Sequence, residues 1–216
     1  MNQRVVEWLN AVKAAPQGVV FSLVAAFVFF LDQMTKWWAV GALTDVFASV
    51  SGGEELGFFA KLDRFLWVRH PARVGEVTVL ENFWHFRYVE NPGAAWGFLS
   101  GAASALRTPF FLLVSLAAMI FIVVYFRRTA KTQLWLRTAL VLVFAGALGN
   151  FVDRARFGYV VDFIEWHWYA KASWPVFNVG DAAISTGVVM MLLEMFFKKT
   201  PAGEKSPSSG QPSGHT

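Results

Sequence analysis

The sequence predicts a mainly α-helical membrane protein with four transmembrane helices, a small extracytoplasmic β region and an interfacial helix. Two observations predict this class. First, 56% of the 216 residues are hydrophobic and only 16% are charged, whereas soluble domains carry about 25% charged residues. Second, four segments are apolar over the roughly 20 residues that a membrane-spanning helix needs. These segments are about 18–43, 105–126, 136–154 and 179–197.

The first span reaches full length only by continuing through Asp32 and Lys36 to Trp37 and Trp38. Asp32 and Lys36 are four residues apart, so they lie on one face of a helix and can pair. The tryptophans lie where an interfacial aromatic belt is expected. A cleaved signal peptide is the alternative interpretation of this segment. It is disfavoured because charged residues separate the apolar core from the possible cleavage site.

The segment of about 44–104 mixes charged and apolar residues, which predicts a long extramembrane loop. From Glu54 to His70 the apolar residues recur with helical spacing, so we expect a short helix at the membrane interface. From Val77 to Val89 apolar and polar residues alternate, which predicts a strand. The turn-forming run from Asn91 to Ala95 ends it.

The third span ends in small and polar residues. Gly146 and Gly149 would let helix backbones approach closely in lipid. Asn150 and Asp153 are three residues apart and share a helix face. A second, aromatic loop of about 155–178 then leads to the fourth span.

Basic residues indicate the orientation of the chain. Arg127, Arg128 and Lys131 fill the short connection between the second and third spans, and two lysines follow the fourth. The positive-inside rule therefore places this connection in the cytoplasm, together with both termini. The termini are an N-terminal segment, 1–17, and a Pro/Ser/Gly-rich tail, 198–216, which we expect to be disordered. The domain between them, 18–197, then has its polar residues at the opposite membrane face.

Composition excludes several kinds of chemistry. The chain has no cysteine, and its four histidines show no metal-binding spacing. The basic residues flank apolar segments, as membrane topology requires, and form no nucleic-acid patch. We therefore predict no metal, no cofactor and no nucleic-acid partner.

Three aspartates lie at or near the ends of apolar segments: Asp153, Asp162 and Asp181. A carboxylate near lipid is costly and marks a candidate functional site. Two carboxylates that face a shared space can hold one proton between them, as in aspartic proteases, so that one activates water and the other donates a proton. Ion translocation and structural pairing are the alternatives that the acids alone leave open.

Five motifs in order resemble the lipoprotein signal peptidases (signal peptidase II), which are aspartic intramembrane peptidases of bacterial inner membranes. The resemblance covers roughly residues 19–197. The motifs are Asp32–Lys36 (DQMTK), Asn91–Ala95 (NPGAA), Gly146–Arg154 (GALGNFVDR), Val160–Phe163 (VVDF) and Phe177–Ile184 (FNVGDAAI).

The resemblance implies a role for each matched residue. Asp162 and Asp181 match the catalytic dyad. Asp32 and Lys36 match a structural pair near the site, and Asp153 with Arg154 is expected to brace it. The residues that would bind substrate or support the site are Asn91, Gly93, Ala94, Gly146, Asn150, Asp153, Arg154 and Asn178.

The resemblance also implies the substrate and the location. The substrate would be a prolipoprotein whose cysteine already carries diacylglyceryl, and cleavage would fall just before that cysteine. We expect a monomer in the bacterial cytoplasmic membrane, with membrane lipids around it and the active site near the outer face. A proton- or ion-coupled transporter using the same carboxylates is the alternative, and a structural or chaperone-like subunit is a third hypothesis.

The sequence departs from the family pattern at three places. Gly180 stands where the family usually has Ala, so we expect a looser backbone there. Ala145 stands where the family often has Gly. The segment from Asp45 to about Val77 is longer than usual, which leaves the substrate role of this region open.

Overall fold

The computed structural model describes residues 17–48, 55–69, 75–93, 104–169 and 171–197, together with Gln3. The tail and nearly all of the N-terminal segment lie outside the described residues. Ala94 does so as well, so its expected place in the site stays a prediction.

Within the described residues, four helices are long and apolar enough to cross a membrane, as the sequence predicts. They are α2 (Gln17–Leu43), α4 (Ser104–Arg128), α5 (Leu134–Phe157) and α6 (Val179–Phe197). Half of the apolar stretch of α5 is buried inside the protein, against 11–17% for the other three. The helix α5 is therefore central, and the other three present most of their apolar surface outward.

The extramembrane segments form an antiparallel sheet in the order β1-β2-β3-β4. The strands are β1 (Glu76–Leu80), β2 (Trp84–Asn91), β3 (Val160–Trp168) and β4 (Ala172–Ser173).

The prediction of one continuous strand from Val77 to Val89 was wrong, because this segment is a hairpin. Asn82 adopts a left-handed φ of 61°, and the amide of Phe83 donates to the carbonyl of Leu80 at 3.1 Å. Asn tolerates this conformation better than most residues do. The alternation of apolar and polar residues continues on both sides of the turn and so conceals it.

The short helix α3 (Phe58–Trp67) lies within the segment where the interfacial helix was expected. It buries Phe65 and exposes Phe58, Phe59 and Trp67, which fits a helix lying at a membrane surface. Arg156 of α5 holds its end by donating to the carbonyl oxygens of Phe65 and Leu66.

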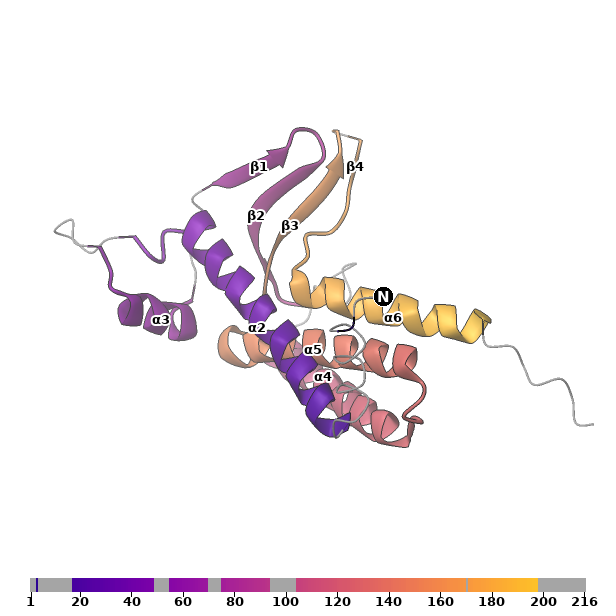
Figure 1. Ribbon diagram of the computed structural model, residues 1–216. Coiled ribbons are helices and arrows are strands. Elements are labelled where there is room, and N and C mark those ends of the chain that lie inside the picture. Colours follow the sequence, from indigo (N-terminus) through magenta and orange to yellow (C-terminus); the bar gives the residue numbers. More distant parts are fainter. Residues whose placement is uncertain are drawn as a thin grey trace, which may run out of the picture.

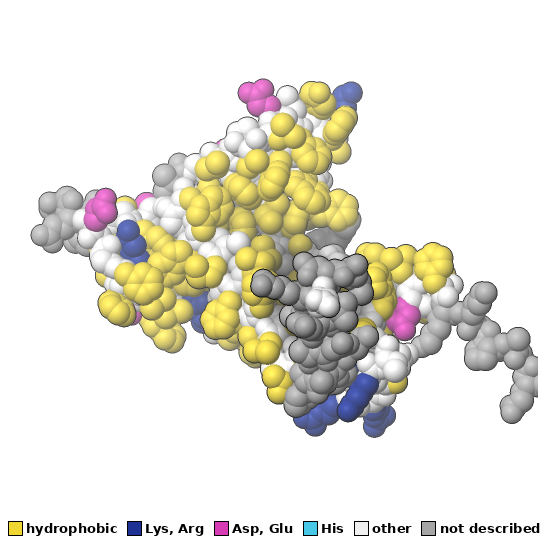
Figure 2. All heavy atoms as spheres, viewed as in Figure 1, with side chains coloured by type: hydrophobic (Ala, Val, Ile, Leu, Met, Phe, Trp, Pro, Cys, Tyr) yellow, Lys and Arg dark blue, Asp and Glu magenta, His cyan; other side chains and the backbone are white. Residues whose placement is uncertain are grey.

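Figure 1 shows the four strands together at one end of the long helices, with α3 to one side of α2. The face of the sheet visible in Figure 2 is largely apolar, and Lys and Arg side chains gather at the end of the molecule away from the sheet. The last turns of α5 and the first turn of α6, where the polar motifs lie, are therefore at the end of the helices nearest the sheet.

Candidate active site

Asp162 of β3 and Asp181 of α6 are joined through Asn178. The Asn178 side-chain amide donates to Asp162 Oδ1 at 2.6 Å. Its Oδ1 accepts the backbone N–H of Asp181 at 2.9 Å, and its own backbone N–H donates to Asp181 Oδ2 at 3.2 Å. This reciprocal pair is a capping box at the start of α6. The cap that begins the helix therefore also fixes both acids.

Each acid receives a further amide. Asn91 Nδ2 donates to Asp162 Oδ2 at 2.8 Å, and Asn150 Nδ2 donates to Asp181 Oδ1 at 2.8 Å. The two carboxyl groups thus accept two N–H groups each, from strand, helix and loop. The predicted gathering of these five residues occurs.

Burial and the negative charge of Asp181 together raise the pKa of Asp162 to about 8, against the opposing effect of the amides of Asn91 and Asn178, which lower it. Asp162 is only 1% exposed, and a buried carboxylate loses its hydration. Asp162 therefore holds a proton at neutral pH.

Lys36 is fully buried beneath the acids. Its ammonium group contacts Asp32 at 2.9 Å and Asp153 at 2.8 Å, and it donates to Asn150 Oδ1 at 3.2 Å. All three ammonium hydrogens have an acceptor, which is what makes a buried charge tolerable. The predicted pair of Asp32 and Lys36 is confirmed, and Asn150 connects it to Asp181.

Asp153 and Arg154 were expected to brace the site together, but no ion pair joins these two neighbours among the described residues. Asp153 pairs with Lys36 instead, and its Oδ2 also accepts the backbone N–H of Val161 at 3.2 Å. Adjacent residues of a helix do not face each other, so the side chains of Asp153 and Arg154 point in different directions. The Arg154 guanidinium lies 5.4 Å from the centre of the Phe111 ring, within electrostatic reach of Asp181 and Asp162.

Glycines allow these groups to approach. A Cβ at Gly149 would lie 2.3 Å from Asp32 Oδ2, and one at Gly93 would lie 2.3 Å from the Phe111 ring. Gly93 also has a φ of +93°, which favours glycine. The looser backbone expected at Gly180 stays a prediction; in the structure the Gly180 amide donates to Asp32 Oδ1 at 2.8 Å.

A cavity of about 440 Å³ opens onto Asp181. Asn91 forms part of its wall, and Ser185 and Thr186 extend it one turn along α6. Apolar and aromatic residues complete the lining: Trp166, Trp174, Pro175, Val176, Phe177 and Ala182.

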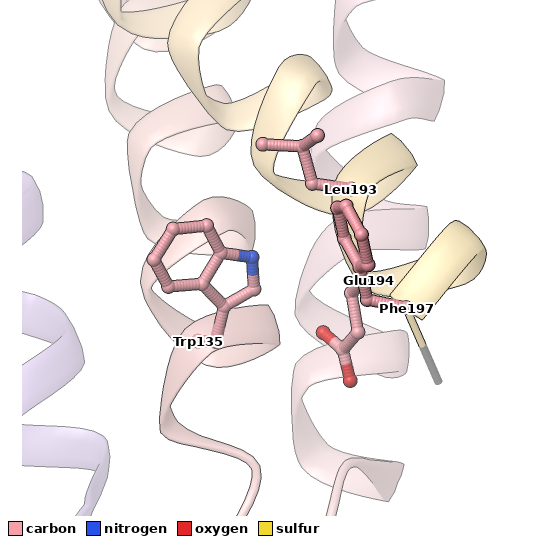
Figure 3. Close-up of a pocket in the computed structure, with 4 residues that line it drawn as sticks. All are labelled: Trp135, Leu193, Glu194 and Phe197. Atoms are coloured by element: carbon pink, nitrogen blue, oxygen red, sulfur yellow. The ribbon is translucent and has the colours of Figure 1, made fainter. Parts of the chain in front are cut away.

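A second cavity, of about 470 Å³, lies at the other end of α5 and α6, between Trp135, Leu193, Glu194 and Phe197 (Figure 3). Asp153 lies 18 positions after Trp135 on α5, which is about 27 Å along a helix. This second cavity is therefore remote from the acids.

Sequence reasoning did not assign roles to Gln33 and Arg156. Gln33 Nε2 donates to Asp32 Oδ2 at 3.2 Å and to Asp153 Oδ1 at 3.3 Å. Arg156 Nη1 donates in turn to Gln33 Oε1 at 3.4 Å. The only sequence signal for Gln33 is its place inside the first motif, and Arg156 resembled an ordinary basic residue at a helix end.

Known proteins are similar to this chain in sequence and in fold. Residues 24–197 match the family model described as signal peptidase (SPase) II. A lipoprotein signal peptidase of Anaeromyxobacter sp. (strain Fw109-5) is 41% identical over 86% of this chain and 88% of its own length. One of Syntrophus aciditrophicus (strain SB) is 33% identical over 84% and 94%.

A solved bacterial membrane enzyme aligns with a TM-score of 0.59 and 29% identity over 86% of this chain and 94% of its own. The fold and the sequence relatives agree. The chain therefore belongs to the signal peptidase II family.

Proposed function

We propose that this chain is an aspartic endopeptidase that removes signal peptides from diacylglyceryl-modified prolipoproteins, cutting just before the lipidated cysteine. It acts as a monomer in the bacterial cytoplasmic membrane, with both termini in the cytoplasm and the site near the outer face. The observation that carries the proposal is the pair of Asp162 and Asp181, which Asn178 joins by hydrogen bonds beside a cavity.

The two acids have different environments, which supports different roles. Asp162 is buried and protonated at neutral pH, so it is the acid. Asp181 faces the cavity, so it is the base that meets water. Environments that separate two carboxyl groups in this way are the basis of acid–base assignments in carboxylate enzymes.

The reaction follows from these roles. Asp181 takes a proton from a water molecule, whose oxygen bonds to the carbonyl carbon of the scissile peptide. Asp162 gives its proton to the carbonyl oxygen. When this intermediate collapses, the C–N bond breaks, the cysteine nitrogen takes the proton held by Asp181, and the hydroxyl proton returns to Asp162. Atoms and charges balance, and both acids regain their starting states.

The cavity suits a lipidated peptide. Its wall beside Asp181 is aromatic, and Ser185 and Thr186 continue it along α6 into the span. A peptide backbone at the mouth would meet Asn91 and Asp181, while acyl chains would lie along the outward apolar surface of the helices. Lipid attached to the cysteine would therefore hold the scissile bond at the depth of the acids.

Two substitutions test the dyad. Asp162→Asn and Asp181→Asn should each lower the rate of prolipoprotein cleavage by at least about 10³-fold, since each removes a proton-transfer step. Asp63→Asn, at an exposed position of α3, is the matched control and should cleave normally. Each protein would be assayed in detergent on a precursor with and without diacylglyceryl on its cysteine, and only the lipidated precursor should be cut.

Thermal unfolding of the same proteins separates chemistry from structure. Folded but inactive variants support the dyad. Near wild-type cleavage by either variant would contradict it, and loss of folding in both would favour a structural role for the acids.

A further inference from the structure

A second group of acids and histidines lies on the sheet, apart from the dyad. Glu76, His85 and Glu165 come from three neighbouring strands, and their ligand atoms all lie within 4.8 Å of one another. None of the three takes part in the contacts of Asp162 or Asp181 described above.

The strand register brings this group together. His85 of β2 lies directly opposite Glu165 of β3. Glu76 of β1 lies opposite Arg87, two residues beyond His85, so Glu76 and His85 are diagonal neighbours on one face. Because side chains alternate along a strand, Glu165 and His167 also share that face. Trp166 between them faces the other way, into the cavity beside Asp181.

His167 adds a second imidazole. Its ring centre lies 4.4 Å from that of His85. Its Nε2 is enclosed and has no hydrogen-bond partner within the described parts of the chain. A buried polar atom without a partner is uncommon in native proteins and calls for an explanation.

Arg87 holds Glu165 in place. Its Nη2 donates to Glu165 Oε1 at 2.6 Å, which leaves Oε2 available. Carboxylates that bind metals are commonly held by such an outer hydrogen bond. With neutral histidines, the two glutamates and Arg87 leave a net charge of −1, which favours a cation.

We propose that Glu76, His85 and Glu165 bind one divalent transition-metal ion of the Zn²⁺ class, with the imidazole of His167 packed beside that of His85. Zn²⁺ takes imidazole nitrogen and carboxylate oxygen at about 2.0–2.2 Å. Two atoms on one such ion are at most about 4.4 Å apart, so small side-chain movements close the site. Ca²⁺ and Mg²⁺ select oxygen ligands alone and fit poorly.

The bound ion would join three strands. The strand β1 is exposed at all five residues, and among the described strands it pairs only with β2. Asn91 is the last residue of β2, and Asp162 lies near the start of β3. The metal-binding strands therefore also carry two residues of the candidate active site. An ion bound to the folded protein alone raises its stability by mass action, so the metal would stabilise the sheet that forms one wall of the cavity.

The test uses the full chain without a polyhistidine tag. Equilibrium dialysis against Zn²⁺ should give one bound ion per chain, and Zn²⁺ but not Mg²⁺ should raise the thermal unfolding midpoint. His85→Gln and Glu165→Gln should each weaken Zn²⁺ binding by more than about tenfold. Glu76→Gln should weaken Zn²⁺ binding as well. Its matched control is Glu81→Gln, which changes an exposed acid of the adjacent turn and should bind Zn²⁺ as the wild type does.

Other histidines are the alternative source of binding. The double variant His70→Gln and His215→Gln removes the two histidines outside the sheet and should retain the site. Binding that survives His85→Gln, or that is lost only in the double variant, would overturn the proposal. So would an equal midpoint shift with Mg²⁺. Because dialysis measures stoichiometry directly, a variant of lower stability still gives an answer.

Discussion

At the level of single residues, opposing effects act on the pKa of Asp162, and one of them is the largest. The amides of Asn91 and Asn178 favour its ionised form, whereas burial and the charge of Asp181 favour the protonated form. Burial is the largest of these effects, so the pKa rises. The protonated form is therefore the one that the fold stabilises, and this stabilisation is complete below the ordinary pKa near 3.8 and is lost as pH rises through about 8.

The same proton predicts the pH dependence of cleavage. As pH rises through about 8, Asp162 loses its proton, so kcat/KM should fall about tenfold for each further pH unit. Initial rates on a lipidated precursor between pH 6 and 10 measure this limb. A profile that stays flat to pH 10, with the protein still folded by circular dichroism, would show that Asp162 is not the proton donor.

For Lys36, residue spacing predicts one of the two acids that pair with it. The four-residue step from Asp32 predicted one partner correctly, since such residues share a helix face. Its second acid, Asp153, comes from α5, and no feature of the sequence links the two. Removing one member of a buried charge network costs about 3–5 kcal/mol, so this arrangement also anchors α2 to α5.

At the level of elements, glycines set the distance between α5 and α6. A Cβ at Gly146 would lie 2.2 Å from the carbonyl oxygen of Gly180, and one at Gly187 would lie 2.6 Å from that of Ala139. The expectation that small residues let helices approach is thereby confirmed. Since α6 carries Asp181 in its first turn, this packing also positions the residue that we propose as the base.

A methyl group at Gly146 should separate these helices. Gly146→Ala places Cβ against backbone atoms of α6, which cannot move aside as a flexible side chain can. The variant should lose about 1–3 kcal/mol of stability and much of its activity. Gly18→Ala is the matched control, because nothing lies within 4 Å of that position. Equal unfolding midpoints for the two variants in detergent would contradict this packing argument.

At the level of elements, the sequence pattern predicted only part of the sheet. Alternation detected strand character in the first loop, but it missed the turn at Asn82, and the second loop was not recognised as containing β3 and β4. In that loop Trp166 and Trp174 line the cavity beside Asp181, a role that depends on pairing between distant strands.

At the level of the whole molecule, the motifs meet at one end of the helix bundle. Asn91 ends β2, Asp162 lies near the start of β3, Asp153 lies near the end of α5, and Asp181 lies in the first turn of α6. Figure 1 shows these strands and helices meeting at one end of the bundle. Basic side chains gather at the opposite end (Figure 2). This polarity supports an orientation with the site at the outer face.

Cysteine labelling tests that orientation, because the chain contains no cysteine of its own. Glu81→Cys places a thiol in the turn of the sheet, and Lys131→Cys places one in the connection between α4 and α5. In intact spheroplasts a membrane-impermeant maleimide should label position 81 and not position 131. After lysis both should react. The reverse pattern in intact cells would invert the topology.

The sequence by itself determined the four spans, the polar motifs and the likeness to signal peptidase II, because span length, helical periodicity and local motifs are properties of neighbouring residues. Only the tertiary structure decided which groups meet. Asp153 pairs with Lys36 and not with its neighbour Arg154. The residue that caps α6 joins Asp162 to Asp181. Strand register places Glu76, His85 and Glu165 close together. The physical reason is that burial, charge pairing and register depend on residues far apart in the chain, and burial in turn decides which aspartate keeps its proton.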